Sequence, residues 1–262
     1  MYNFSYVTTE GIVKTVNQDS LLIKIAEYKK QRILFAAVCD GMGGLYGGEK
    51  ASSFVISGIS DWFENEYPQI IRRAGNILEI RQNFDECLHR LHDDIINSTE
   101  SGKAMGTTLT SLLIDPLLDV TLTAHVGDTR LYRIFSNRLE VVTSDHSVVA
   151  EEVRRGIISE EQARNDSRQN QITNCIGVAS GNGIYDFIIQ EPCTDCVYMI
   201  CSDGFRKMIT EDELKTYLNP TINPDNNSIK SNLEYLLKLN IRRKESDNIT
   251  ALAVRYTKEA DV

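Results

Sequence analysis

The chain has 262 residues, of which 42% are hydrophobic and 25% are charged, an ordinary globular composition that does not predict disorder. Acidic side chains outnumber basic ones by 37 to 28, which gives a formal net charge of -9, and no dense block of lysine and arginine occurs. This balance argues against nucleic acid and membranes as partners. The N-terminal residues lack the pattern of a signal peptide, and no apolar run is long enough to span a bilayer, so we expect a cytoplasmic protein.

The first predicted elements surround a glycine-rich turn. Residues 11–25 are read as a strand, a polar interruption and a second strand, and residues 33–39 are seven consecutive apolar residues that predict a strand buried on both faces. That strand delivers Asp40 into a turn containing Gly41, Gly43, Gly44, Gly47 and Gly48. Because glycine permits close backbone approach, we expect Asp40 at a sheet end in a cleft beside a small bound species.

The rest of the chain alternates predicted helices with a block of strands. Apolar residues recur at helical spacing over 49–66 and 77–95. Strands are predicted at 107–114, 120–126, 130–135, 139–143, 184–190, 198–202 and 249–256, and helices at 211–217 and 229–240. The charged segment 148–171 is read as an insertion that carries little core. We therefore expect one α+β domain over residues 1–262, with two packed antiparallel sheets and helices outside.

Several aspartates lie next to predicted strands. Asp40, Asp128 and Asp203 follow apolar or alternating runs, while Asp19 and Asp247 precede them. Each alone is usually a surface residue. Gathered at one edge of the sandwich, they would repel one another unless a cation lay between them, and ligation by oxygen alone suits magnesium or manganese. The sequence therefore predicts a divalent-metal site.

These residues occur in motifs whose order resembles that of a known family. The motifs are Asn17-Gln18-Asp19, Asp40-Gly-Met-Gly-Gly with Gly48-Glu49-Lys50-Ala51-Ser52, Met105-Gly-Thr-Thr-Leu-Thr, His125-Val-Gly-Asp-Thr-Arg-Leu-Tyr, Ser144-Asp-His-Ser147, Cys201-Ser-Asp-Gly204 and Asp247-Asn-Ile-Thr250. Together they span nearly the whole chain. They are similar to those of the metal-dependent serine/threonine protein phosphatases of type 2C, in their compact bacterial form.

The resemblance implies an αββα sandwich with a two-metal centre that holds manganese or magnesium. Asp40 would bridge the two ions, Asp203 and Asp247 would hold one of them, and the Gly41 carbonyl and Asp19, directly or through water, would serve the other. Asp128 would join Asp203 in holding a third, weaker ion. The segment 148–171 corresponds to the flap beside the active site. Metal-activated water would attack the phosphate in line, so that no protein nucleophile is required.

The chain departs from the family pattern at several positions. Gln18 stands where many members have a metal-binding glutamate, so that one ion would be held more weakly. Lys14 occupies the place of an arginine that grips the substrate phosphate, and it is our candidate for that role, with a solvated surface lysine as the alternative. Met42 and Leu45 stand where some members carry a histidine proposed as general acid. His146 is a conceivable substitute, although a structural hydrogen-bonding role is favoured.

Three functions are weighed on these residues. The leading one is an enzyme that removes phosphate from phosphoserine or phosphothreonine in proteins and so opposes a cytoplasmic serine/threonine kinase. The second is hydrolysis of small phosphate esters at the same centre. The third is a non-catalytic phosphoprotein-binding module, against which the retained aspartates argue, because a binding module has no reason to gather carboxylates that repel one another.

Overall fold

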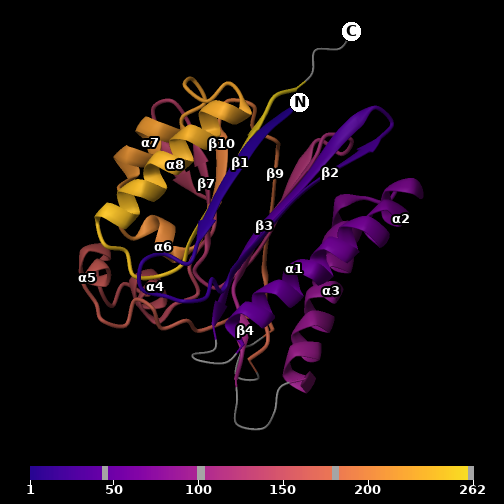
Figure 1. Cartoon of the computed structure of the whole chain (residues 1–262). Helices are drawn as coiled ribbons and strands as arrows, with labels where there is room; N and C mark the ends of the chain where they lie inside the picture. Colours follow the sequence, from indigo (N-terminus) through magenta and orange to yellow (C-terminus); the bar gives the residue numbers. More distant parts are fainter. Residues whose placement is uncertain (43–46, 99–103, 179–182, 259–262) are drawn as a thin grey trace.

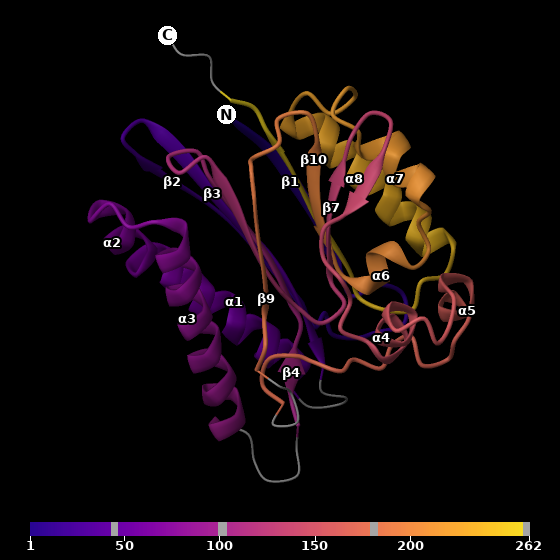
Figure 2. The same cartoon turned by 180° about the vertical axis from the view of Figure 1, so that it is seen from behind.

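The computed structural model describes residues 1–42, 47–98, 104–178 and 183–258. Two antiparallel sheets lie face to face, as Figures 1 and 2 show from opposite sides. The first has the order β1 (Tyr2–Thr9), β11 (Ile249–Tyr256), β10 (Val197–Cys201), β7 (Arg130–Ile134) and β8 (Leu139–Val141). The second has the order β2 (Asp19–Tyr28), β3 (Gln31–Met42), β5 (Leu109–Asp115), β6 (Val120–Val126) and β9 (Asp186–Gln190), and the short β4 (Gly106–Thr107) also pairs with β3.

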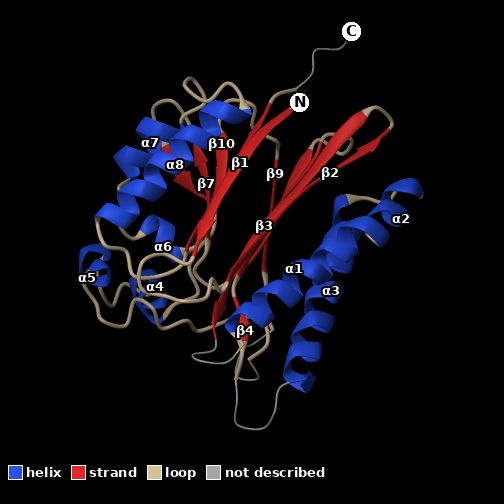
Figure 3. Cartoon of the chain, viewed as in Figure 1, coloured by secondary structure: helices blue, strands red, loops and turns tan. Residues whose placement is uncertain are grey.

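Helices cover the outer face of each sheet (Figure 3). The second sheet is covered by α1 (Gly48–Asn65), α2 (Tyr67–Arg72) and α3 (Ile77–Ser98). The first sheet is covered by α6 (Asp203–Arg206), α7 (Glu211–Leu218) and α8 (Asn226–Arg242). The predicted α+β fold, an αββα sandwich, is confirmed. None of the helices in these described ranges has the length and apolarity needed to cross a bilayer.

Strand β3 contributes side chains to two hydrophobic cores. Its side chains alternate between faces, so that Leu34, Ala36 and Val38 pack between the sheets while Phe35 and Ala37 pack under the helices. All five are fully buried. The predicted strand with two buried faces is therefore present, and each large apolar side chain buried in this way contributes roughly 1.5–3 kcal/mol. The helical core includes Trp62, whose ring stacks on Phe84 at a centroid distance of 4.3 Å.

Two boundaries predicted from the sequence were wrong. The first strand is β1, Tyr2–Thr9, and residues 10–18 form a loop in place of the strand predicted to begin at Gly11. β1 alternates irregularly between buried and exposed side chains and is an edge strand, which weakens its period-two signal. The strand predicted at 107–114 is divided at Thr108, where β4 ends and β5 begins at Leu109.

The insertion predicted at 148–171 forms two short helices, α4 (Val148–Arg154) and α5 (Glu160–Arg164). Its two ends meet, because Ser147 and Ile172 form an isolated β-bridge and the amide of Val148 donates to the carbonyl of Gln171 at 2.9 Å. Ser147 also caps α4, since its hydroxyl accepts a hydrogen bond from the Ala150 amide. The two ends of the segment thus lie side by side, and the segment follows the irregular residues 142–146 that include Asp145 and His146.

Candidate active site

Two of the predicted metal ligands face each other on neighbouring strands. Asp19 opens β2 and lies directly opposite Asp40 near the end of β3. The backbone of Asp40 is fixed by two threonines: its amide donates to the Thr108 hydroxyl at 2.9 Å, and its carbonyl accepts from the Thr107 hydroxyl at 2.9 Å. The prediction that an apolar strand presents Asp40 near its end matches this placement.

The glycines beside Asp40 allow two backbone segments to touch. A Cβ atom on Gly41 would lie 2.1 Å from the Gly48 carbonyl oxygen and 2.7 Å from that of Gln18. Neither contact is possible for a larger residue, so Gly41 is required for the start of α1 to approach β3. Gly41, the predicted carbonyl ligand, therefore lies next to Asp40 and to the Asn17-Gln18-Asp19 motif. Gly43, Gly44 and Leu45 lie outside the described residues.

Asp203 reaches the site from the first sheet. The sequence indicated a strand end, but β10 stops at Cys201, and Asp203 begins the short helix α6 after the extended residue Ser202. The Ser202 hydroxyl donates to Asp19 Oδ2 at 3.0 Å, and it accepts a hydrogen bond from the Thr250 amide at 3.1 Å. Ser202 thereby ties together β2, β10 and β11 at the point where the carboxylates gather.

Asp128 follows β6 and is 4% exposed. The residue before it, Gly127, has a φ of 101°, a left-handed conformation that turns the chain out of the strand. The guanidinium of Arg206 donates to the Asp128 carbonyl oxygen at 3.2 Å, and its Nη2 lies 3.9 Å from Asp128 Oδ2. Asp128 is thus buried beside α6, the helix that Asp203 begins.

The side chain of Asp247 is 35% exposed, and two lysines lie beside it. Lys14 Nζ is 3.3 Å from Asp247 Oδ1, and Lys207 Nζ is 4.0 Å from Asp247 Oδ2. The neighbouring Asn248 holds the loop of Lys14, because its amide group donates to the carbonyls of Glu10 and Val16 and its oxygen accepts from the Gln18 amide. Lys14 therefore lies in an ordered loop at the site.

The grouping of these carboxylates shows in their electrostatics. Burial, and after it the charges of Asp203 and Asp247, raise the pKa of Asp19 to about 7, although hydrogen bonds from Thr250 and Ser202 act to lower it. Burial also raises the pKa of Asp128 to about 7, with the charge of Asp203 as the next cause. The pKa of Asp40 is raised well above its ordinary value by burial and then by the charges of Asp19, Asp203, Asp128 and Asp247. The structure thus brings all five predicted aspartates together.

Two carboxylate oxygens in this group could accept a bound cation. Asp19 Oδ1 and Asp203 Oδ1 are buried, and neither has a hydrogen-bond partner among the described residues. Leaving such oxygens unpaired is costly, whereas a divalent cation coordinated by carboxylates would satisfy both. Within residues 1–42, 47–98, 104–178 and 183–258, however, no three His, Cys, Asp or Glu side chains already surround a common point as metal ligands would. The donor set fits a hard cation, and ligation requires side-chain adjustment.

His146 occupies a structural position. Its Nδ1 accepts a hydrogen bond from the Gly127 amide at 3.3 Å, and its Nε2 lies 3.1 Å from Asp186 Oδ2. The ring also packs against His125 at a centroid distance of 5.0 Å. With both ring nitrogens engaged, His146 agrees with the structural role favoured from the sequence. Met42 is the last residue of β3, and Leu45 lies outside the described residues.

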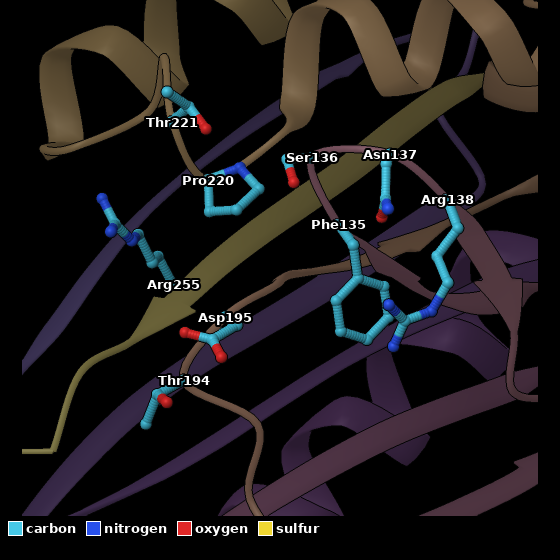
Figure 4. A pocket seen from close by; sticks show the side chains of 9 residues that line it. All are labelled: Phe135, Ser136, Asn137, Arg138, Thr194, Asp195, Pro220, Thr221 and Arg255. Atoms are coloured by element: carbon cyan, nitrogen blue, oxygen red, sulfur yellow. The ribbon is translucent and has the colours of Figure 1, made fainter.

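The pocket shown in Figure 4 lies at the other end of the sandwich. It has a volume of about 410 Å³ and is lined by Phe135, Ser136, Asn137, Arg138, Thr194, Asp195, Pro220, Thr221 and Arg255. Asp195 precedes β10, whereas Asp203 follows that strand, so the length of β10 separates the pocket from the carboxylates. The pocket therefore does not belong to the acidic site, as we call the region formed by Asp19, Asp40, Asp128, Asp203 and Asp247.

The sequence analysis gave no role to several side chains of the site. Ser202 and Asn248 lie inside recognised motifs next to predicted ligands, and that adjacency was the available signal. Arg206 and Lys207 follow Asp203 in the first turn of α6. The spacing of four residues between Asp203 and Lys207 is typical of a helical ion pair and could have indicated their contact.

The comparisons with known proteins agree with this geometry. The family model described as protein phosphatase 2C matches residues 11–238. A putative protein phosphatase 2C-type from Streptococcus pyogenes is 30% identical over 235 residues, 89% of each chain. A serine/threonine phosphatase of Listeria welshimeri is 31% identical over 221 residues, 83% of this chain and 82% of that one.

Solved structures share the whole architecture. The serine/threonine phosphatase of S. agalactiae superposes with a TM-score of 0.82 at 28% identity, covering 98% of this chain and 100% of that one. The phosphatase PstP, determined with two manganese ions, has a TM-score of 0.76 at 22% identity over 98% and 99% of the two chains, and this likeness shows the fold alone. The family model and the relatives together establish that the chain belongs to the protein phosphatase 2C family.

Proposed function

We propose that this protein serine/threonine phosphatase uses its five converging aspartates to hold divalent cations, manganese or magnesium, for hydrolysis of phosphoserine and phosphothreonine. The observation that carries the proposal is the pair of buried, unpartnered oxygens on Asp19 and Asp203, in a group of carboxylates where burial and neighbouring charges raise the pKa of Asp19 and of Asp40. A folded protein has no structural need for such a group, because it destabilises the metal-free state.

Each proposed ligand is assigned to particular ions. Asp40 would bridge two ions, Asp203 and Asp247 would hold one, and the Gly41 carbonyl with Asp19 would serve the other. Asp128 would hold an additional, weaker ion together with Asp203. Bound ions would supply an activated water and neutralise charge on the phosphoryl oxygens. The chain's own contribution is to fix these ligands: Thr107 and Thr108 hold Asp40, and Ser202 holds one oxygen of Asp19.

Lys14 is the proposed phosphate-binding residue. Its side chain is 44% exposed, so a phosphate can reach its ammonium, which lies 3.3 Å from Asp247 Oδ1. A lysine offers a compact charge on a flexible stem, whereas an arginine would offer a planar fork with two parallel hydrogen bonds. We therefore expect phosphate to be held beside Asp247 with looser orientation than an arginine would give.

Phosphorylated proteins, the products of a cytoplasmic serine/threonine kinase, are the proposed substrates. Hydrolysis of a phosphothreonine peptide and of p-nitrophenyl phosphate, each with and without manganese, tests this. We expect manganese-dependent turnover of both, with the higher kcat/KM on the peptide. A preference for the small ester would favour a small-molecule phosphatase, and no turnover of either compound with manganese would favour a binding module.

The additional ion is tested through Asp128. We expect Asp128→Ala to lower activity at limiting manganese and to leave the tight sites occupied, because Asp40, Asp203 and Asp247 remain. Calorimetric titration with manganese measures both. Loss of the tight sites in this variant would contradict the assignment of Asp128 to a separate ion.

A further inference from the structure

Lys207 places its ammonium beside two carboxylates of the acidic site. Its Nζ lies 2.5 Å from Asp203 Oδ2 and 4.0 Å from Asp247 Oδ2. Both aspartates belong to the ligands proposed for one ion. The Lys207 side chain is 22% exposed and that of Asp203 is 9% exposed, so the closer contact is mostly shielded from water.

Helix α6 fixes this contact. Lys207 follows Asp203 by four residues, and its amide donates to the Asp203 carbonyl at 2.9 Å, which closes the helical turn. Side chains four residues apart in a helix lie on the same face, so Lys207 is held over the carboxylate that begins the helix. The packing of Phe205, which is fully buried in the core under α7 and α8, anchors the same turn.

We propose that Lys207 is an internal counter-ion of the acidic site, which stabilises the metal-free protein and lowers its affinity for the divalent ion held by Asp203 and Asp247. The inference rests on the proposed function of these aspartates. It concerns a residue of this chain to which the family resemblance assigned no role.

A comparison with Asp19 gives the direction of the effect. Each of these two carboxylates has one oxygen held by the protein and one buried oxygen without a partner. Asp19 is held by a neutral hydroxyl, that of Ser202, which fixes the carboxylate and does not repel a cation. Asp203 is held by an ammonium, whose charge opposes the arrival of a divalent ion at the remaining oxygen.

The same contact explains how the metal-free site tolerates its charge. The Lys207 ammonium lies 2.5 Å from one oxygen of Asp203 and 4.0 Å from one oxygen of Asp247, which are two of the carboxylates that repel one another. The ammonium therefore offsets part of the repulsion among the carboxylates. Metal binding must compete with this interaction, so the protein exchanges an internal cation for an external one.

Lys207→Met tests the inference, because methionine keeps most of the side-chain length and removes the charge. At neutral pH we expect calorimetric titration to show manganese binding at least tenfold tighter than in the wild type. The melting temperature of the metal-free variant should fall, because Asp203 loses its partner, and the rise on adding manganese should be larger than in the wild type.

Two further variants serve as controls. Lys207→Arg keeps the positive charge, so its manganese affinity should stay within about twofold of the wild type. Lys215→Met removes a lysine that pairs with the exposed Asp212 on α7, and it should change neither affinity nor melting temperature. Lys207→Gln repeats the test should the methionine variant fail to fold.

The possible outcomes separate this inference from the proposed function. Equal or weaker manganese binding in Lys207→Met and Lys207→Gln, in proteins that remain active, would overturn the counter-ion role and leave the metal assignment intact. Weaker binding would instead show that Lys207 helps by orienting Asp203. Absence of manganese binding in the wild type and in every variant would overturn the metal-dependent function, and the inference with it.

Discussion

Asp145 and the five aspartates of the acidic site lie within one small region, and the protein compensates their charges differently. Asp145, at the base of the 148–171 segment, accepts hydrogen bonds from Arg130 Nε at 2.7 Å and Nη2 at 2.8 Å, and from Arg206 Nη2 at 3.1 Å. Although burial acts to raise its pKa, these guanidinium groups hold the pKa of Asp145 below its ordinary value. Asp145 is therefore fully compensated by the folded chain.

The carboxylates of Asp19 and Asp128 in the acidic site are compensated less fully than that of Asp145. Burial raises the pKa of Asp19 and of Asp128 to about 7, and no guanidinium forms a two-pronged pair with either of them in the described ranges. Arg206 lies between Asp145 and Asp128: it donates hydrogen bonds to the Asp145 carboxylate and to the backbone carbonyl of Asp128, and its Nη2 lies 3.9 Å from Asp128 Oδ2. The difference teaches that burial alone does not identify a functional carboxylate: the informative feature is a buried carboxylate oxygen without a hydrogen-bond partner among the described residues, as on Asp19 and Asp203.

The largest effect is expected at the acidic site. Asp203→Asn keeps the size of the side chain and removes the charge that a divalent ion needs, so manganese-dependent turnover should fall by about a thousandfold or more, roughly 4 kcal/mol of transition-state stabilisation. Steady-state kinetics on a phosphothreonine peptide measure the loss, and circular dichroism checks the fold. Asp212→Asn, on an exposed carboxylate of α7, is the matched control. Wild-type rates in Asp203→Asn would show that the metal assignment is wrong.

The compensated carboxylate, that of Asp145, should respond in stability. Arg130→Met leaves Asp145 buried with half of its partners, and breaking a buried pair in this way costs about 3–5 kcal/mol of unfolding free energy. Urea denaturation measures it. Arg138→Met removes an exposed pair with Glu140 and should cost less than about 1 kcal/mol. Equal losses in the two variants would remove the distinction between buried and exposed pairs here.

A pH dependence of stability is expected from His125, which is fully buried. Burial, and then the charge of His146, lower the pKa of His125 from 6.5 to about 4. Between these values the unfolded chain therefore binds more protons at His125 than the folded chain does, so His125 alone contributes stability that is fully present above about pH 6.5 and is lost as the pH falls toward 4, by up to about 3 kcal/mol. The raised pKa values of Asp19 and Asp128 act in the opposite direction over the same range, so the contribution of His125 is the difference in slope between the wild type and a variant that lacks the imidazole. Chemical denaturation across this range measures the slope.

His125→Gln should lack this contribution, because the variant has no group to protonate at this position, so acidification toward pH 4 should destabilise it less than the wild type. His89→Gln, on the exposed face of α3, should leave the slope of the wild type unchanged. The same slope in His125→Gln as in the wild type would show that His125 contributes nothing to the pH dependence.

The smallest effect is expected at the edge of the acidic site. Lys14→Ala should raise KM for a phosphopeptide about tenfold for each 1.4 kcal/mol of lost binding, with kcat reduced less. Lys14→Arg should keep or improve KM, because its fork can reach the same oxygens. A Lys14→Ala enzyme with unchanged KM and kcat would leave Lys14 as surface charge beside Asp247.

The sequence predicted the parts of the structure that local pattern controls. The apolar run before Asp40, and the helical spacing of Ala51, Val55, Ile59 and Trp62 on α1, depend on which faces are buried, and both elements lie where predicted. Motif order then led to the five aspartates. Local pattern carries no information on which distant segments touch, so the Ser202–Asp19 bond across 183 residues could not be foreseen.

The Lys207–Asp203 pair and the helical position of Asp203 were missed for a related reason. A strand of five residues followed by a helix of four has no room for a period to develop, so the turn at Ser202 leaves no signal in the pattern of apolar residues. Strand β1 was missed because an edge strand with one half-exposed face alternates weakly.

The pairing of β1 with β11, in register from Tyr2 opposite Tyr256 to Thr9 opposite Ile249, has a consequence for synthesis on the ribosome. β11 lies between β1 and β10, so the first sheet cannot close until residues 249–256 have emerged. Asp247 and Thr250, which complete the site and position Ser202, emerge together with this strand. A nascent chain therefore carries most of its acidic side chains without a formed site, and catalytic competence should begin abruptly, once β11 has emerged and paired.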